Sequence, residues 1–230
     1  MIPSANDMSG AVKGYLQILQ REEIIENASF SYVEQALRFV TGATKSWSLK
    51  VSPSSPLKFR TVFDPHLGYS VFPVVYLDVE VDEALHIHKV PPFKKLVVTL
   101  EVKRFSDSGI IYRTHFDLAN KSGNPAIYQE GPLYHVQFGG HSPGGVRASD
   151  FKLKIPRWTH PPMDLILVCE TIVANFYPEK WRKLKGQRSW IEYINQSQQL
   201  CYTSYFEKTN TVLSGGRSLL NEMWAVEWGV

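Results

Sequence analysis

The chain has 230 residues, of which 43% are hydrophobic, 13% aromatic and 20% charged, and its formal net charge is +3. A chain of this length can bury a sizeable core, and its aromatic content is too high for an intrinsically disordered segment. Two cysteines exclude a disulfide framework, while a sequence pI of about 8.7 permits a nucleic-acid partner without requiring one.

The first part of the chain has the apolar periodicity of amphipathic helices. Apolar residues recur at three- and four-residue spacing, which predicts two helices within residues 7–40 and an interruption at residues 27–29. Ser31 is the expected cap of the second helix, because Glu34 follows three residues later as in a capping box. Gly42 is expected to end that helix.

The middle of the chain alternates apolar and polar residues, which is typical of β-strands. Short segments rich in Gly, Pro, Asn and Ser separate the strands and are too short for crossover helices, so consecutive strands should be mostly antiparallel. The candidate strands are residues 47–51, 58–63, 71–81, 95–105, 110–118, 133–139 and 151–155.

The last part of the chain returns to a helical pattern. Residues 163–176 are apolar almost all round, which indicates a buried helix, and helices are also predicted at 179–184 and 189–206. A hinge at 214–216 precedes a short tail rich in Trp and Leu. The whole order predicts one α+β domain: N-terminal helices (1–44), a twisted, mostly antiparallel sheet of five to seven strands (45–157), and C-terminal helices and tail (158–230). We expect the helices to pack on one face of the sheet.

The strand alternation gives this sheet one apolar and one polar face. One interpretation of the polar face is simple exposure to water, which antiparallel sheets commonly show. Another is a functional acid–base set, since histidine titrates near neutral pH and arginine suits phosphate. The residues expected on this face are Glu101, Lys103, Arg113, His115, Asp117, His135 and Gln137.

The composition of this face favours metal-independent cleavage of RNA. In this hypothesis His115 and His135 transfer protons, as a base for the 2′-hydroxyl and an acid for the leaving group. Arg113 and Lys103 contact the phosphate, and Glu101 orients groups or acts as a base. No cofactor is needed for this chemistry.

Two metal-dependent alternatives stay open. Glu101-Val102-Lys103 resembles the Glu-x-Lys half of a restriction-type nuclease motif, with Asp78 or Glu80 as the upstream acid, and would hold Mg²⁺. That superfamily expects a helix and parallel pairing after this strand, whereas residue 110 onward looks like a hairpin return. His86 and His88, joined by His135 or His141, could chelate a metal, although Pro91 and Pro92 nearby favour a loop.

Two further segments are candidate interaction surfaces. Basic residues interleaved with tryptophan can bind a nucleic-acid backbone and stack bases, although a solvated helix with its Trp packed inward has the same pattern. The residues concerned are Lys180, Trp181, Arg182, Lys183, Lys185 and Arg188. Alternatively, the protein is a non-catalytic interaction module whose tail at 214–230, with Trp224 and Trp228, docks an antitoxin or another subunit.

One stretch of the sequence resembles a known family. A Tyr-His-x-Gln strand (Tyr134, His135, Gln137), a loop with Gly and His, and the run His160-Pro161-Pro162-Met163-Asp164-Leu165 resemble the small TumE-type toxins of bacterial toxin–antitoxin pairs. The resemblance covers residues 95–176, while this chain is much longer and lacks a dense histidine cluster before the Pro-Pro. It implies a prokaryotic toxin or antiviral defence component, with His135, His160 and Asp164 at matching positions.

These observations lead to one functional expectation. We expect a prokaryotic, nucleic-acid-directed effector that cleaves or binds RNA through the polar face of its sheet. The first residues lack the basic and apolar regions of a signal peptide, and no window approaches 18 uninterrupted apolar residues. We therefore expect a cytoplasmic protein without a membrane partner.

Overall fold

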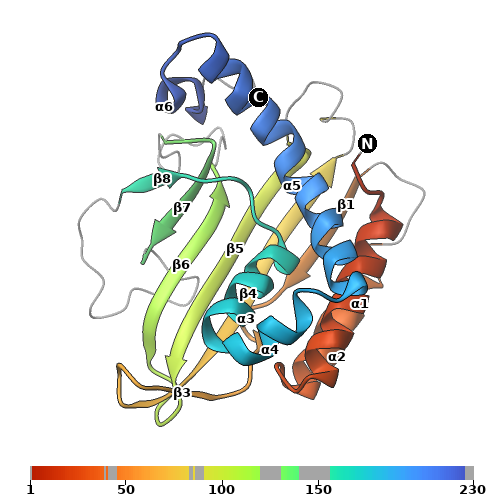
Figure 1. Cartoon of the computed structure of the whole chain (residues 1–230), viewed down its shortest axis with the longest axis vertical. Helices are drawn as coiled ribbons and strands as arrows, with labels where there is room; N and C mark the ends of the chain where they lie inside the picture. Colours follow the sequence, from red (N-terminus) through yellow and green to blue (C-terminus); the bar gives the residue numbers. More distant parts are fainter. Residues whose placement is uncertain are drawn as a thin grey trace.

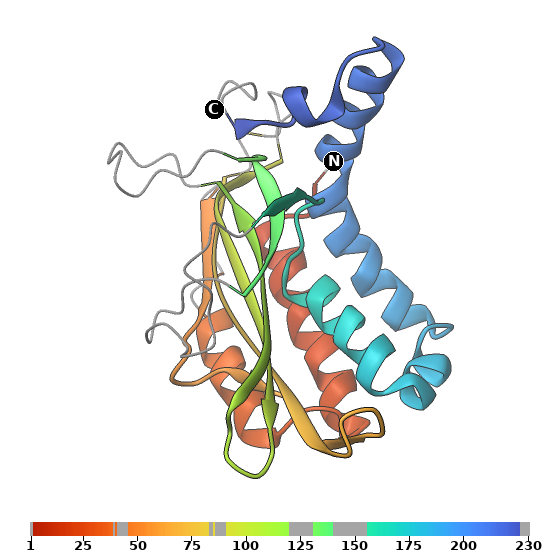
Figure 2. The ribbon, with the colours of Figure 1, turned by 90° about the vertical axis from the view of Figure 1, so that its left-hand side faces the viewer.

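The computed structural model describes residues 2–38, 40, 46–82, 85, 91–119, 131–139 and 156–225. Within these ranges the molecule has two layers, an antiparallel sheet and a set of helices that covers one face of it (Figures 1 and 2). The predicted α+β class and the packing of the helices on one face are confirmed. The described sheet has eight strands, one more than the upper limit that we expected.

The N-terminal helices are α1 (Ala5–Arg21) and α2 (Asn27–Leu37). A capping box starts α1, in which Ser4 and Asp7 bond each other's backbone N–H. The expected capping box of α2 is wrong, because α2 begins four residues before Ser31. Ser29 lies inside α2, where its hydroxyl accepts the backbone N–H of Lys58 and so joins the helix to the sheet.

The strands are β1 (Ser46–Val51), β2 (Leu57–Lys58), β3 (Val62–Asp64), β4 (Tyr69–Asp82), β5 (Phe93–Arg104), β6 (Ile110–Leu118), β7 (Tyr134–Phe138) and β8 (Arg157–Thr159). Their order is β1-β4-β5-β6-β7-β8, and β2 and β3 also pair with the long β4. Every described strand pair is antiparallel, as the short connections predict.

Two strand predictions need comment. The strand expected at 58–63 is divided into β2 and β3, because Phe59 bridges to Ile25 and Arg60 donates its N–H to the carbonyl of Ile24 in the α1–α2 connection. The strand expected at 151–155 lies outside the described residues. The short strand β8 was not predicted.

The C-terminal helices are α3 (Leu165–Phe176), α4 (Pro178–Leu184), α5 (Arg188–Ser214) and α6 (Leu219–Glu222). Helix α3 begins two residues after the predicted start at 163, and Asp164 is its N-cap, which accepts the N–H of Leu167. Helix α5 continues eight residues past its predicted end at 206, and Gly216 follows it with a φ of 65°. A left-handed conformation of this kind suits glycine and ends the helix.

The core lies between the sheet and the helices. Helix α3 is buried on most sides between the sheet and α1 and α5, which explains its apolar sequence. Tyr15 of α1 and Trp190 of α5 pack with ring centroids 4.6 Å apart and join the two helices. Across the described parts of the chain, no helix has both the length and the apolar character needed to cross a membrane.

Candidate functional site

Part of the polar face of the sheet, around Glu101, Arg113, His115 and His135, is closed to water. It lies on the side away from the helices, since the alternate residues Val98, Leu100, Phe116 and Val136 belong to the helix-side core. Yet four of the seven side chains expected on the polar face are buried, while Lys103, Asp117 and Gln137 are partly buried. The exposed fractions are 4% for Glu101, 1% for Arg113, 8% for His115 and 4% for His135. Simple exposure to water therefore does not explain these residues.

Glu101 and Arg113 form a buried ion pair across β5 and β6. The two residues are direct register partners, and Arg113 places both Nε and Nη2 2.8 Å from Oε1 of Glu101. The Lys103 ammonium lies 3.2 Å from Oε2, and the Tyr76 hydroxyl donates to Oε1 at 3.1 Å. Burial raises the pKa of Tyr76 to about 12, so this hydroxyl keeps its proton. The Glu101 carboxylate is thus fully engaged by three neighbours.

A pocket of about 410 Å³ opens on the same face beside this ion pair. Its volume is within the range of sites for small ligands. It is formed by side chains of four neighbouring strands and the turn after β1. The polar groups that line it and carry the argument below are Lys50, Asp78, Lys95, Thr99, His115 and Asp117.

His115 and Asp117 lie together in this pocket because they are two residues apart on β6. The Nδ1 atom of His115 is 3.0 Å from Oγ1 of Thr99, its register partner on β5. Burial raises the pKa of Asp117 to about 7, against the opposing charge of Arg157. Among the described residues, Oδ1 of Asp117 is buried without a hydrogen-bond partner. A protonated carboxyl is the form that this environment favours.

His135 lies behind the pocket, directly opposite Asp117 on β7. Its Nδ1 is 3.0 Å from the carbonyl oxygen of Pro132, which accepts only, so Nδ1 carries the proton. Burial is the main cause that lowers the pKa of His135 to about 4, and the positive charge of Arg157 lowers it further. Its imidazole is therefore neutral at neutral pH.

Two lysines supply positive charge at the rim of the pocket. Lys95 and Lys50 lie 2.8 Å and 3.3 Å from Oδ2 of Asp78, and both ammonium groups are largely in water. The hydrogen bonds from these lysines lower the pKa of Asp78 although burial raises it. The rim thus combines one carboxylate with two partly exposed cations that pair with it.

The basic segment predicted to bind nucleic acid lies in the helix layer, across the sheet from the pocket (Figures 1 and 2). Lys180 donates to the backbone carbonyls at the end of α1, which makes it a helix cap. The Trp181 ring is partly buried against the core, with the Lys185 ammonium 4.6 Å from its centroid. Arg182 and Arg188 pair with acids on their own helices, and Lys183 is exposed.

Two features of the structure disfavour the Mg²⁺-dependent nuclease hypothesis. The Glu101 carboxylate is occupied by cationic partners, and Asp78 is bound by lysines. Strand β6 returns antiparallel to β5, which differs from the parallel pairing expected for restriction-type nucleases. In the described ranges no cluster of three or more His, Cys, Asp or Glu side chains is arranged to hold a metal. His86, His88 and His141 lie outside those ranges.

The three positions matched by the TumE-type resemblance do not share one face. His135 is on the polar face, whereas His160 packs against Phe116 on the helix side, with ring centroids 5.3 Å apart. Asp164 is buried, caps α3 and accepts a hydrogen bond from Ser197 of α5. Asp164 is therefore buried in the core, and His160 is partly buried against its edge.

The C-terminal segment is partly built into the fold. Leu133 donates its N–H to the carbonyl of Met223 at 2.9 Å, and Ala225 donates to Gly131 at 3.0 Å. Met223 and Ala225 are buried, and Trp224 is partly buried. Trp228 lies outside the described residues.

The pocket contains residues that the sequence hypothesis did not assign a role. Asp117 was expected on the polar face, but its burial and its place beside His115 emerge only from the fold. Lys50 enters the pocket because β1 pairs with β4, so that Lys50 faces Asp78. Strand alternation alone predicts that Thr99 and Asp117 lie on this face, but it does not predict which strand pairs with β1.

Comparisons of the chain with models of protein families, with curated proteins and with solved structures found no match. Any functional conclusion therefore rests on the chemistry of the pocket.

Proposed function

We propose that this protein is a metal-independent RNA-cleaving enzyme in which His115 and Asp117 are the acid–base pair. The supporting observation is the pairing of these two side chains in one pocket, with the pKa of Asp117 raised to about 7. Groups that exchange protons near neutral pH are the most effective general acids and bases. Lys50 and Lys95 at the rim provide the cations that a phosphodiester needs.

The proposed reaction follows from these positions. Nδ1 of His115 contacts the Thr99 hydroxyl, which can donate or accept, and Nε2 is buried in the described structure. In the proposed reaction Nδ1 carries the proton of the imidazole, and Nε2 accepts the proton of a ribose 2′-hydroxyl that enters the pocket. The 2′-oxygen attacks phosphorus, a cyclic phosphate forms, and the bond to the 5′-oxygen breaks. The protonated carboxyl of Asp117 gives its proton to that leaving oxygen, so each proton has a donor and an acceptor.

The other predicted catalytic residues take supporting parts in this proposal. The Arg113 charge is directed to Glu101, and Lys103 contacts the same carboxylate, so these three side chains stiffen β5 and β6 beneath the site. His135 stays neutral opposite Asp117, so it adds no charge beside that carboxyl. In this proposal Lys50 and Lys95, and not Arg113 and Lys103 as the sequence predicted, contact the phosphate.

The biological setting remains part of the proposal. A bacterial toxin or defence component acting on RNA in the cytoplasm is consistent with the resemblance over residues 95–176. The alternative of a non-catalytic module that docks through its tail requires a free C-terminal segment, whereas residues 223–225 pair with residues 131–133. An antitoxin-like partner would then have to bind another surface.

The test uses the full chain, a fluorescent single-stranded RNA and a chelator in the buffer. We expect cleavage by the wild type, with His115→Ala and Asp117→Asn each reducing kcat by about 10²–10⁴-fold. His66→Ala, in the exposed β3–β4 turn, and Asp107→Asn, in the exposed β5–β6 hairpin, are matched controls and should cleave normally. An inert wild type, or full activity in the His115→Ala/Asp117→Asn double variant, would contradict the proposal.

A further inference from the structure

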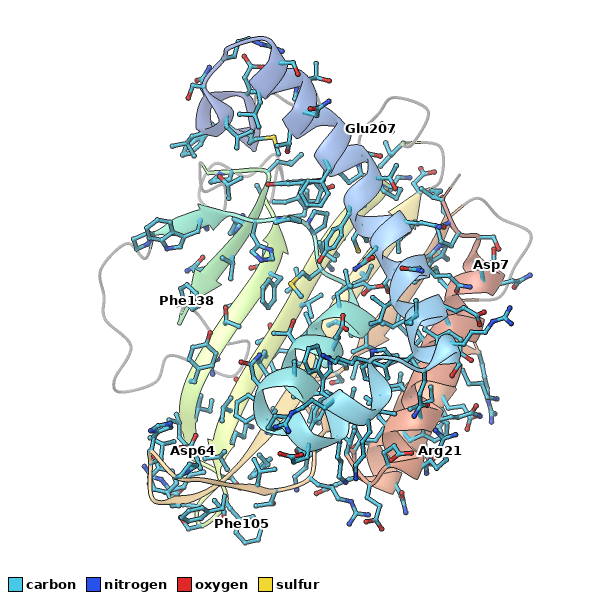
Figure 3. The ribbon with its side chains drawn as sticks, viewed as in Figure 1. Asp7, Arg21, Asp64, Phe105, Phe138 and Glu207 are labelled. Carbon is cyan, nitrogen blue, oxygen red and sulfur yellow. The ribbon has the colours of Figure 1, made fainter. Side chains whose placement is uncertain are left out.

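Three aromatic side chains are exposed on the helix-side face of the sheet, where no helix covers β7, β8 and the start of β6 (Figure 1). Tyr112 on β6 is 39% exposed, Phe138 on β7 is 49% exposed, and Trp158 on β8 is 61% exposed. Figure 3 shows the labelled Phe138 on this open part of the sheet. Exposed aromatic clusters of this kind are characteristic of binding surfaces.

The strand register arranges the three rings as a diagonal row. Phe138 pairs with Thr114, which is two residues from Tyr112, and Trp158 pairs with Val136, which is two residues from Phe138. Diagonal neighbours of this type are about 7–8 Å apart in an antiparallel sheet. The Tyr112 and Phe138 centroids are 6.3 Å apart, so the first two rings lie side by side. We call these three residues the aromatic row.

The charges on this side of the sheet favour a polyanion over a protein partner. The basic segment of α4 and the start of α5 lies in the helix layer, on the same side of the sheet as the aromatic row (Figures 1 and 2). Within residues 178–188 five basic side chains accompany a single acid, Glu179. Lys183 and Lys185 are exposed, whereas Lys180 caps α1 and Arg182 and Arg188 pair with acids on their own helices. Aromatic rings for bases and cations for phosphates on one side of a sheet are the combination that binds single-stranded nucleic acid.

The short strand β8 connects the row to the pocket side of the sheet. Trp158 belongs to the row, while its neighbours Arg157 and Thr159 pair with Gln137 and His135 on the opposite face. In the described strand order β8 is the last strand, beyond β7. A polynucleotide that passes over β8 can thus touch both faces.

We propose that single-stranded RNA stacks its bases on Tyr112, Phe138 and Trp158 and reaches the pocket around β8. This inference rests on the proposed function, because it takes RNA as the substrate of the pocket. It adds a binding subsite and a preference for unpaired strands. Double-stranded RNA is excluded from the row, since paired bases do not expose their faces.

The binding test measures anisotropy of a labelled twelve-residue oligo(dT), which lacks the 2′-hydroxyl and is not cleaved. We expect Tyr112→Ala, Phe138→Ala and Trp158→Ala each to raise Kd by about 5- to 150-fold, which corresponds to the typical stacking contribution per base. Trp158→Phe should stay within about threefold of the wild type, because a ring remains for stacking. Phe105→Ala, in the exposed β5–β6 hairpin, is the matched control and should bind normally.

A kinetic experiment separates failure of the row from failure of the proposed function. With long RNA the triple alanine variant should show a raised KM, whereas its kcat on a dinucleotide should match the wild type. If the triple variant binds oligo(dT) and cleaves long RNA like the wild type, the row is overturned and the pocket chemistry stands. If oligo(dT) binding depends on the row but no RNA is cleaved, the proposed function fails and the row remains as a binding surface. If the wild type neither binds nor cleaves, both proposals fail.

Discussion

Asp117 and His135 face each other directly across β6 and β7, and burial shifts their pKa values in opposite directions. The pKa of Asp117 rises to about 7 and that of His135 falls to about 4. Both groups therefore favour their uncharged forms at slightly acid pH. Between about pH 4 and 7 neither side chain carries a charge, and Asp117 is the one that exchanges its proton near neutral pH.

This pair predicts two opposing effects of pH on stability. Between about pH 4 and 7 the folded state keeps the Asp117 proton that the unfolded chain loses, so this residue makes stability fall as pH rises. Between about pH 4 and 6.5 the unfolded chain protonates His135 while the folded state does not, so stability rises with pH. In the wild type the two slopes should nearly cancel.

Single variants should reveal each slope in urea unfolding at several pH values between 4 and 8. In Asp117→Asn the free energy of unfolding should rise with pH, because only His135 still titrates. In His135→Gln it should fall with pH, because only Asp117 still titrates. Each slope amounts to roughly 3–4 kcal/mol over its range as an upper limit. Parallel profiles for both variants would show that the two groups are not buried as described.

The raised pKa of Asp117 also predicts the pH dependence of cleavage. As the proposed general acid, Asp117 acts in its protonated form, which predominates below about pH 7. Thus kcat should fall about tenfold per pH unit above that value. Asp117→Asn should lose most of the activity, and its residual kcat should no longer fall above pH 7. If the residual kcat still falls in the same way, another group is the general acid.

The buried pair Glu101–Arg113 predicts a strongly non-additive double variant. Arg113→Met alone should destabilise the protein by about 3–5 kcal/mol, because it leaves a carboxylate buried beside fewer cations. Adding Glu101→Leu should recover most of this loss. A double-mutant cycle by chemical denaturation checks the coupling, and simple additivity would contradict a direct buried pair.

Asp164 joins α3 to α5, which predicts a larger loss than an ordinary helix cap. Asp164→Ala removes the acceptor for the N–H of Leu167 and for the Ser197 hydroxyl, both buried, and should cost about 2–4 kcal/mol. Asp7→Ala is the comparison: it removes the carboxylate that accepts from Ser4 in the exposed capping box of α1, and it should cost about 1 kcal/mol or less. Equal losses in thermal or urea unfolding would contradict this difference.

Met223 tests whether the C-terminal segment belongs to the core. Met223 is 1% exposed, so Met223→Ala should destabilise by about 2–5 kcal/mol. Leu220, which is 55% exposed in α6, is the matched control, and Leu220→Ala should change the stability by less than about 0.5 kcal/mol. If the two variants unfold alike, the segment is a free tail as the docking alternative requires.

Sequence periodicity by itself determined the main elements of this protein. The helices α1, α3 and α4 and the strands β1 and β4–β7 follow from local patterns, because side-chain spacing sets which face of each element is apolar. The same alternation placed Glu101, Arg113, His115 and His135 on one face. Boundaries set by long-range contacts, such as the division at Phe59, did not follow from local pattern.

Only the tertiary structure decided what the polar face is. Alternation is the same for a wet face and for a buried one, so the sequence did not distinguish an exposed Glu101 from one enclosed by Arg113 and Tyr76. The pocket depends on β1 lying beside β4, which brings Lys50 to Asp78 across 28 residues of chain. The pKa of Asp117 depends on burial, a property of the surroundings that the sequence of one strand does not contain.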